Sequence, residues 1–71
     1  MPKLFSSKQI ITTLQKRGFV FVSQRGSHIK MRNLGAQIKT VIVPVGKKEI
    51  PRGTFRSILR QSGLGIEDFE K

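Results

Sequence analysis

The sequence contains no cysteine among its 71 residues. No disulfide can therefore stabilise the fold, and no thiolate is available for a structural zinc site. A chain of this length has room for one domain with a modest core. Residues 1–71 are accordingly expected to form a single domain that depends on tight local packing or on a bound partner.

Acidic residues are also scarce, with four Asp and Glu against fourteen Lys and Arg and a formal net charge of +10. Glu67, Asp68 and Glu70 lie together at the C-terminal end, which leaves Glu49 as the only carboxylate before them. With a single histidine besides, the sequence offers neither a carboxylate pair for acid–base chemistry nor a conventional metal site, and no cofactor is expected. So large an excess of positive charge favours a polyanionic partner. Nucleic acid ranks above an anionic membrane, because the chain has no long basic amphipathic helix.

Long hydrophobic runs are missing as well, so no membrane span is expected. The first residues, 1–6, have neither the apolar stretch nor the small-residue cleavage site of a secretory signal. The expected location is the cytoplasm.

The residues that are present predict an α+β domain. Ser6 and Gln9 fit a capping box at the start of a helix over 7–17, and Gly18 is suited to end it. β-branched and alternating stretches, separated by short turns, indicate an antiparallel meander. A second helix carries Phe55, Ile58 and Leu59 at helical spacing, and a last helical turn contains Ile66 and Phe69. The predicted order is α-β-β-β-α with a three-stranded antiparallel sheet, its strands at 19–22, 28–32 and 40–45 and its second helix at 54–62.

His28 is the only candidate proton acceptor in the body of the chain. It follows a turn that includes Gly26 and Ser27, and strand alternation places it on one face with Lys30 and Arg32, while Ile29 and Met31 point to the core. A lone histidine is more often a bystander than a catalyst. RNA cleavage, however, needs little beyond a base for the 2′-OH proton and cations to stabilise the transition state.

A series of arginines marks the second helix. Arg52, Arg56 and Arg60 recur every four residues and therefore lie along one side. Exposed arginines are often no more than good helix formers. Here, two of them lie at the positive end of the helix dipole, which favours an anion-binding role, and Lys47 and Lys48 would extend the same patch.

Phe19 and Phe21 admit two interpretations. Aromatic residues on a sheet can stack on RNA bases. Because the chain has few large apolar residues, a structural role for both is the favoured expectation.

In several motifs the chain resembles the HicA family of toxins. The matching motifs run in order through most of the sequence: Leu14-Gln15-Lys16-Arg17-Gly18-Phe19, Gln24-Arg25-Gly26-Ser27-His28, Val41-Ile42-Val43-Pro44, and Ile50-Pro51-Arg52-Gly53-Thr54-Phe55-Arg56-Ser57-Ile58-Leu59-Arg60-Gln61-Ser62-Gly63. The resemblance implies an mRNA interferase of a type II toxin–antitoxin module, with a fold like that of double-stranded RNA-binding domains. It also implies that His28 is the catalytic residue and that a HicB-like antitoxin binds the toxin and covers the active site. Many relatives have a second histidine or an aromatic residue just after the motif, where this chain has Ile29-Lys30-Met31.

The leading hypothesis is therefore a metal-independent endoribonuclease acting on mRNA, with His28 as the catalytic acid/base. The alternative is a non-catalytic RNA-binding module of the same fold, and a weaker third possibility is a DNA-binding or ribosome-associated protein. Gly26 and Ser27 form the expected active-site turn. The expected RNA-binding residues are Arg25, Lys30, Arg32, Lys47, Lys48, Arg52 and Arg56.

Overall fold

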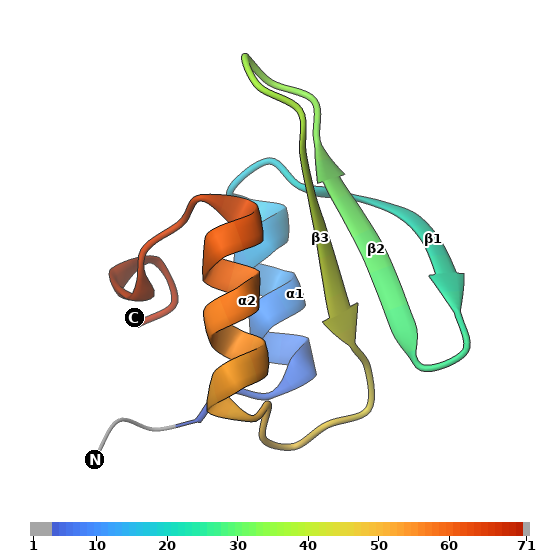
Figure 1. The fold of residues 1–71 in the computed structure, drawn as a ribbon, viewed down its shortest axis with the longest axis vertical. Helices are drawn as coiled ribbons and strands as arrows, with labels where there is room; N and C mark the ends of the chain where they lie inside the picture. Colours follow the sequence, from blue (N-terminus) through green and yellow to red (C-terminus); the bar gives the residue numbers. More distant parts are fainter. Residues whose placement is uncertain (1–3, 71) are drawn as a thin grey trace.

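The computed structural model describes residues 4–70. It contains two helices, a three-stranded sheet and a short 3₁₀ helix (Figure 1). In chain order the elements are α1 (Ser7–Lys16), β1 (Val20–Arg25), β2 (His28–Asn33), β3 (Lys39–Pro44), α2 (Arg52–Ser62) and η1 (Ile66–Asp68). The predicted α+β order is confirmed.

The first helix begins and ends as the sequence predicts. The Ser6 side chain accepts a hydrogen bond from the Gln9 amide, and the Gln9 side chain accepts one from the Ser6 amide, which completes the capping box. At the other end Gly18 takes a φ of +93°, which only glycine adopts at little cost. These signals fix both ends of α1 locally.

The three strands form an antiparallel sheet in the order β1-β2-β3, so β2 is central. Arg25 lies opposite His28 across the first hairpin, and His28 lies opposite Pro44 in β3. β1 runs three residues further than the predicted 19–22, because the hairpin turn needs only Gly26 and Ser27. β3 starts and ends one residue earlier than the predicted 40–45, with Pro44 as its last residue.

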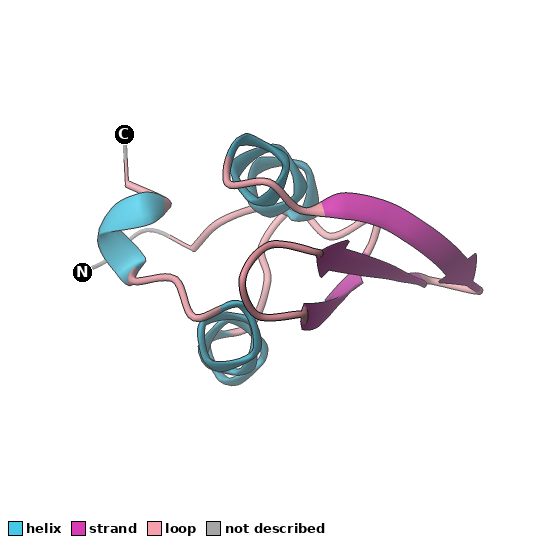
Figure 2. Cartoon of the chain, turned by 90° about the horizontal axis from the view of Figure 1, so that it is seen from above, coloured by secondary structure: helices cyan, strands magenta, loops and turns pink. Residues whose placement is uncertain are grey.

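Both helices lie on the same side of the sheet (Figures 1 and 2). The buried residues between these layers form one core of nine side chains: Ile10, Leu14, Phe19, Met31, Val41, Val43, Ile50, Ile58 and Phe69. Met31, Val41 and Val43 define the face of the sheet that packs against the helices, and Ile29 is half-buried on the same face. The opposite face carries no helix (Figure 2).

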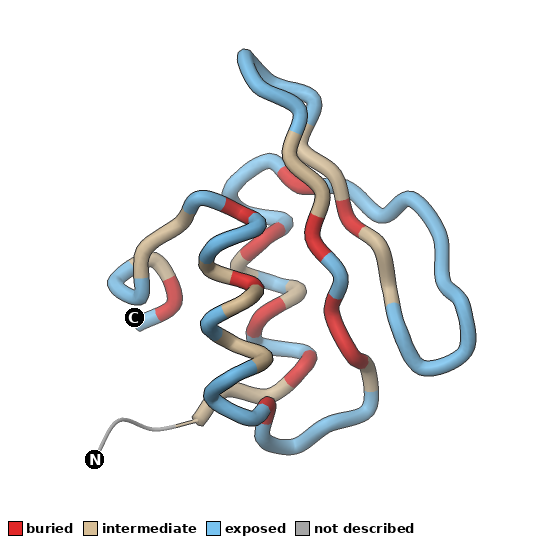
Figure 3. The backbone as a smooth tube through the Cα atoms, viewed as in Figure 1, coloured by how far each residue is buried: buried red, intermediate tan, exposed pale blue. Residues whose placement is uncertain are grey.

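The expectation that both Phe19 and Phe21 are structural is wrong for Phe21. Phe19 is buried at 2% exposure, whereas Phe21 is 57% exposed. Phe21 lies opposite the core residue Met31. However, β1 is an edge strand of the sheet, and all its residues are exposed (Figure 3). The helices contact β3, at the other edge of the sheet, so the core stops short of Phe21.

The second helix starts two residues earlier than predicted. The Phe55 amide donates to the Pro51 carbonyl, so α2 begins at Arg52. Pro51 precedes the helix in an extended conformation, with a φ of −57° and a ψ of 149°, which proline adopts readily because its ring holds φ near this value. Gly63 ends the helix with a φ of +75°, as the sequence predicts.

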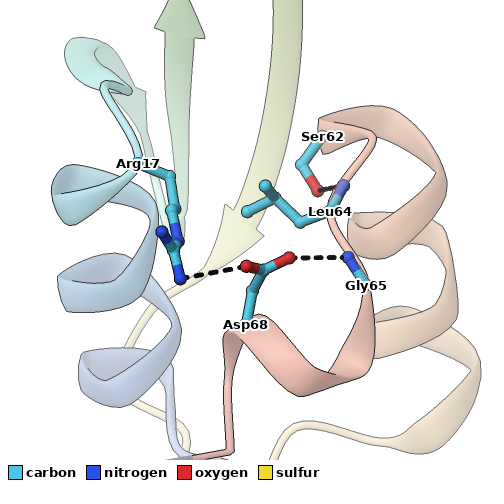
Figure 4. A network of polar contacts seen from close by, with 5 residues as sticks. All are labelled: Arg17, Ser62, Leu64, Gly65 and Asp68. Carbon is cyan, nitrogen blue, oxygen red and sulfur yellow. Dashed lines mark hydrogen bonds and ion pairs between the residues drawn. The ribbon is translucent and has the colours of Figure 1, made fainter.

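The C-terminal 3₁₀ turn is fixed by polar contacts to its own entry and to α1 (Figure 4). Asp68 accepts a hydrogen bond from the Gly65 amide at 2.9 Å and forms an ion pair with Arg17 at 3.0 Å. The Leu64 amide donates to the Ser62 hydroxyl at 3.2 Å. These contacts place Phe69 in the core, where its ring lies edge-on to Phe55.

Ser7 joins the start of α1 to the segment after β3. Its buried hydroxyl donates to the Pro44 carbonyl at 2.6 Å and accepts from the Lys47 amide at 3.0 Å. We expect Ser7→Ala to lower the free energy of unfolding by about 2 kcal/mol, because it leaves a carbonyl and an amide without their partner. Urea denaturation measures this change. Thr12→Ala, at an exposed position of the same helix, is the control, and an equal effect of both variants would contradict the role given to the Ser7 hydroxyl.

Over the described range, neither helix has the length and apolar character needed to cross a bilayer.

Candidate functional site

His28 is the first residue of β2 and is exposed to solvent. The two-residue turn before it depends on Gly26, whose φ of +59° lies in the left-handed region. Strand pairing places His28 beside Arg25 on one side and Pro44 on the other. The predicted turn and the candidate catalytic residue are therefore adjacent, at one end of the sheet.

Hydrogen bonds hold this turn from both sides. The Gln24 side-chain amide donates to the Gly26 carbonyl at 3.0 Å, and the Val45 amide donates to the Ser27 carbonyl at 2.7 Å. The Ser27 hydroxyl lies 3.4 Å from Nδ1 of His28. The backbone that carries the imidazole is thus fixed on a rigid sheet, as a precisely placed catalytic group requires.

A groove with a volume of about 470 Å³ surrounds the imidazole. Its lining residues are Ser23, Arg25, His28, Ile29, Lys30 and Ile42. Most of these residues are neighbours across the sheet. Lys30 in β2 lies between Ser23 in β1 and Ile42 in β3, on the face that the helices leave open. The groove is large enough for a small group such as a phosphate.

The electrostatic environment of the groove is positive. Arg25 and Lys30 line it, and Arg32 follows two residues along the same face. Arg32 is held in place by its Nε, which donates to the Thr40 hydroxyl at 3.1 Å. None of the residues found to line the groove is acidic. Such a surface attracts anions and stabilises negative charge that develops on a bound group.

The other predicted cations do not line this groove. Lys47 and Lys48 lie exposed in the loop after β3, whose Val45 is bonded to Ser27. Arg52 and Arg56 line a separate pocket with Phe5 and Phe55, on the helical side of the molecule. The structure therefore separates the cations around His28 from those on α2, and it leaves Lys47 and Lys48 in the loop after β3, outside both pockets.

Within residues 4–70, no three His, Cys, Asp or Glu side chains come together as a metal-binding group. Among the residues that line the groove, His28 is the one whose side chain can serve as a general base. Arg25 and Lys30 supply fixed positive charge beside it. The arrangement suits proton transfer on an anionic substrate that brings its own nucleophile.

Some residues around His28 were not predicted from the sequence. Ile42 lines the groove because it alternates with the buried Val41 and Val43, a signal that strand periodicity does contain. Gln24 bonds to the Gly26 carbonyl two residues away, within the motif that contains His28. The contact of Thr40 with Arg32 depends on the register between β2 and β3, which a local motif does not reveal.

The chain is similar to a known protein family. The family model described as the HicA toxin of bacterial toxin–antitoxin systems matches residues 7–64. This range includes the groove residues, both helices and the whole sheet. No curated protein matches the chain.

Proposed function

The chain belongs to the HicA toxin family, and from this premise we propose that it is a metal-independent endoribonuclease that cuts mRNA in the cytoplasm. His28 is the catalytic acid/base in this proposal. The main support for the proposal is the position of His28. Its exposed imidazole follows a turn held by hydrogen bonds and lies in a groove that Arg25 and Lys30 also line. That is the minimum needed to activate a 2′-OH and stabilise the charge that follows.

The proposed reaction uses the substrate as its own nucleophile. His28 accepts the proton of a 2′-OH, whose oxygen attacks the adjacent phosphorus, and the bond from phosphorus to the 5′ oxygen breaks. Arg25 and Lys30 stabilise the negative charge on the phosphoryl oxygens. The leaving 5′ oxygen takes a proton, which solvent can supply in an exposed groove. The products are a 2′,3′-cyclic phosphate and a 5′-OH end.

Incubating the purified protein with an end-labelled single-stranded RNA in excess EDTA tests this proposal. We expect cleavage to continue, and the 3′ ends formed to be cyclic phosphates or their opened products. Binding of RNA without any cleavage would favour the alternative, a non-catalytic RNA-binding module. Cleavage that EDTA stops and Mg²⁺ restores would contradict the proposed chemistry.

The same proposal places the RNA phosphates along the open face of the sheet. We expect Lys30→Gln and Arg32→Gln each to weaken RNA binding and to flatten the dependence of log K on log salt by about 0.7 per lost phosphate contact. Fluorescence anisotropy at several salt concentrations measures both quantities. Arg60→Gln removes the same charge from the exposed side of α2 and is the matched control. If it flattens the slope equally, the contacts are not confined to this face.

A toxin of this family has an antitoxin as its partner. We propose that a HicB-like antitoxin inhibits cleavage by covering His28. Diethyl pyrocarbonate modifies histidine and, more slowly, lysine, so its reaction with His28, the only histidine in the chain, is followed by tandem mass spectrometry of the toxin peptide that contains it. We expect the reaction to slow by at least about tenfold in the complex. An unchanged rate while cleavage is blocked would show that inhibition does not require occlusion.

A further inference from the structure

A second pocket lies on the helical side of the molecule and shares no lining residue with the groove around His28. Its volume is about 230 Å³, and its walls include Phe5, Phe55, Leu59 and Ile66, with Arg52 and Arg56. Every lining side chain other than the two arginines is apolar. The pocket thus combines a hydrophobic interior with two guanidinium groups.

The walls of this pocket are fixed by the core beneath them. The rings of Phe5 and Phe55 lie 5.3 Å apart, and Phe55 packs edge-on against the buried Phe69 at 5.2 Å. The Ile50 amide donates to the Phe5 carbonyl at 2.7 Å, which ties the segment before α1 to the segment before α2. An occupant would therefore enter a pocket that already exists and would not have to order its walls.

The chemistry of the pocket selects between two kinds of occupant. An RNA base carries polar edges that lose hydrogen bonds with water unless the protein replaces them. The side chains that line the pocket include donors in its two arginines but no hydrogen-bond acceptor, so the N–H groups of a base would find no side-chain partner there. An aliphatic side chain, in contrast, gains from leaving water, and carboxylates next to it can pair with Arg52 and Arg56, which lie one helical turn apart.

We infer that this pocket binds an acidic segment of the antitoxin, with an apolar side chain of that segment in the hydrophobic interior and its carboxylates at the two arginines. The inference rests on the antitoxin partner of the family and is independent of the chemistry assigned to His28. Charge complementarity favours this occupant, since the chain has a net charge of +10 and none of the residues found to line the pocket is acidic. The antitoxin would then contact the toxin at a site remote from the reacting groups.

Two synthetic peptides test the inference directly. The first has two leucines flanked by glutamates, and the second has serines in place of the leucines, so the two have equal charge. In NMR titrations of the labelled protein, we expect the leucine peptide to shift the amide signals of Phe55, Arg56 and Leu59 and to leave that of His28 unchanged. The serine peptide should bind at least about tenfold more weakly, because burial of a leucine contributes about one power of ten or more to affinity.

Arg56→Gln and Arg60→Gln form the matched pair of variants. Both arginines are exposed on α2, but only Arg56 lines the pocket. We expect Arg56→Gln to weaken the leucine peptide about three- to fivefold, as for an exposed charge pair, and Arg60→Gln to change it less. Circular dichroism checks that both variants keep the fold.

Three results would overturn the inference. Equal affinity for the two peptides would show that charge alone attracts them, and shifts confined to the His28 groove would show that the pocket is not their site. A short RNA that shifts the pocket amides and displaces the leucine peptide would identify a nucleic-acid site instead. RNA cleavage is measured separately, so failure of the ribonuclease proposal and failure of this inference give different results.

Discussion

His28→Ala should lower the rate of RNA cleavage by at least about a hundredfold, because a positioned general base contributes two to four powers of ten. The affinity for RNA should fall much less, since Arg25, Lys30 and Arg32 remain in place. Stability should change by less than about 0.5 kcal/mol, as expected for an exposed side chain. Single-turnover cleavage, anisotropy and thermal denaturation measure the three quantities.

Chemical rescue makes this prediction more specific. The groove around His28 is open and has a volume of about 470 Å³, so free imidazole can enter the space that the alanine leaves. We expect added imidazole to restore part of the cleavage by His28→Ala and to have no comparable effect on the wild-type protein. Cleavage by His28→Ala near the wild-type rate, without imidazole, would contradict the catalytic role and support a binding module.

Ile58→Ala should have the largest effect on stability. Ile58 is completely buried in α2 and belongs to the single core of the domain. Truncation of such a side chain costs about 2–5 kcal/mol, and a domain of this size has only about 4–11 kcal/mol in total. We expect Tm to fall by roughly 10–40 °C, measured by circular dichroism.

Ile38→Ala is the control for this loss. Ile38 is 72% exposed in the connection between β2 and β3, so the same truncation removes no core contact. It should change stability by less than about 0.5 kcal/mol. A loss of stability as large for Ile38→Ala would mean that the described core does not dominate stability.

The antitoxin should raise the stability of the Ile58→Ala variant, by about 4 kcal/mol at a thousandfold excess over its Kd.

Local signals in the sequence were sufficient for the ends of α1 and for the turn before His28. The Ser6 and Gln9 side chains bond to backbone amides only three residues away, and Gly26 permits a backbone angle within its own residue. Such interactions depend on neighbouring residues alone. They can therefore be predicted without knowing how the elements pack.

Packing over longer distances decided the features that could not be predicted. Phe21 has the sequence character of a core residue, but its exposure depends on β1 being the outer strand and on where the helices lie. The separation of Arg52 and Arg56 from His28 likewise depends on how α2 packs against the sheet. Helical spacing places the two arginines on one side of α2, but it does not say what that side faces.

The candidate site was predictable in part for the same reason. Alternation along β2 correctly placed His28 and Lys30 on one face, because that pattern is a property of a single strand. Alternation along β3 places Ile42 on the open face, but its position beside Lys30 needed the register between β2 and β3, as did the contact of Arg32 with Thr40. The roles of these residues in RNA cleavage remain predictions.

We propose that His28 activates the 2′-OH of the substrate, and a pair of matched RNA oligonucleotides tests this role. One is entirely RNA, and the other has a single 2′-deoxynucleotide at the position where the first is cut. We expect the wild-type protein, in EDTA, to bind both with similar affinity but to cut only the first at that position, because the second lacks the nucleophile. Cleavage of both at similar rates would show that water attacks the phosphate and would contradict the role proposed for His28.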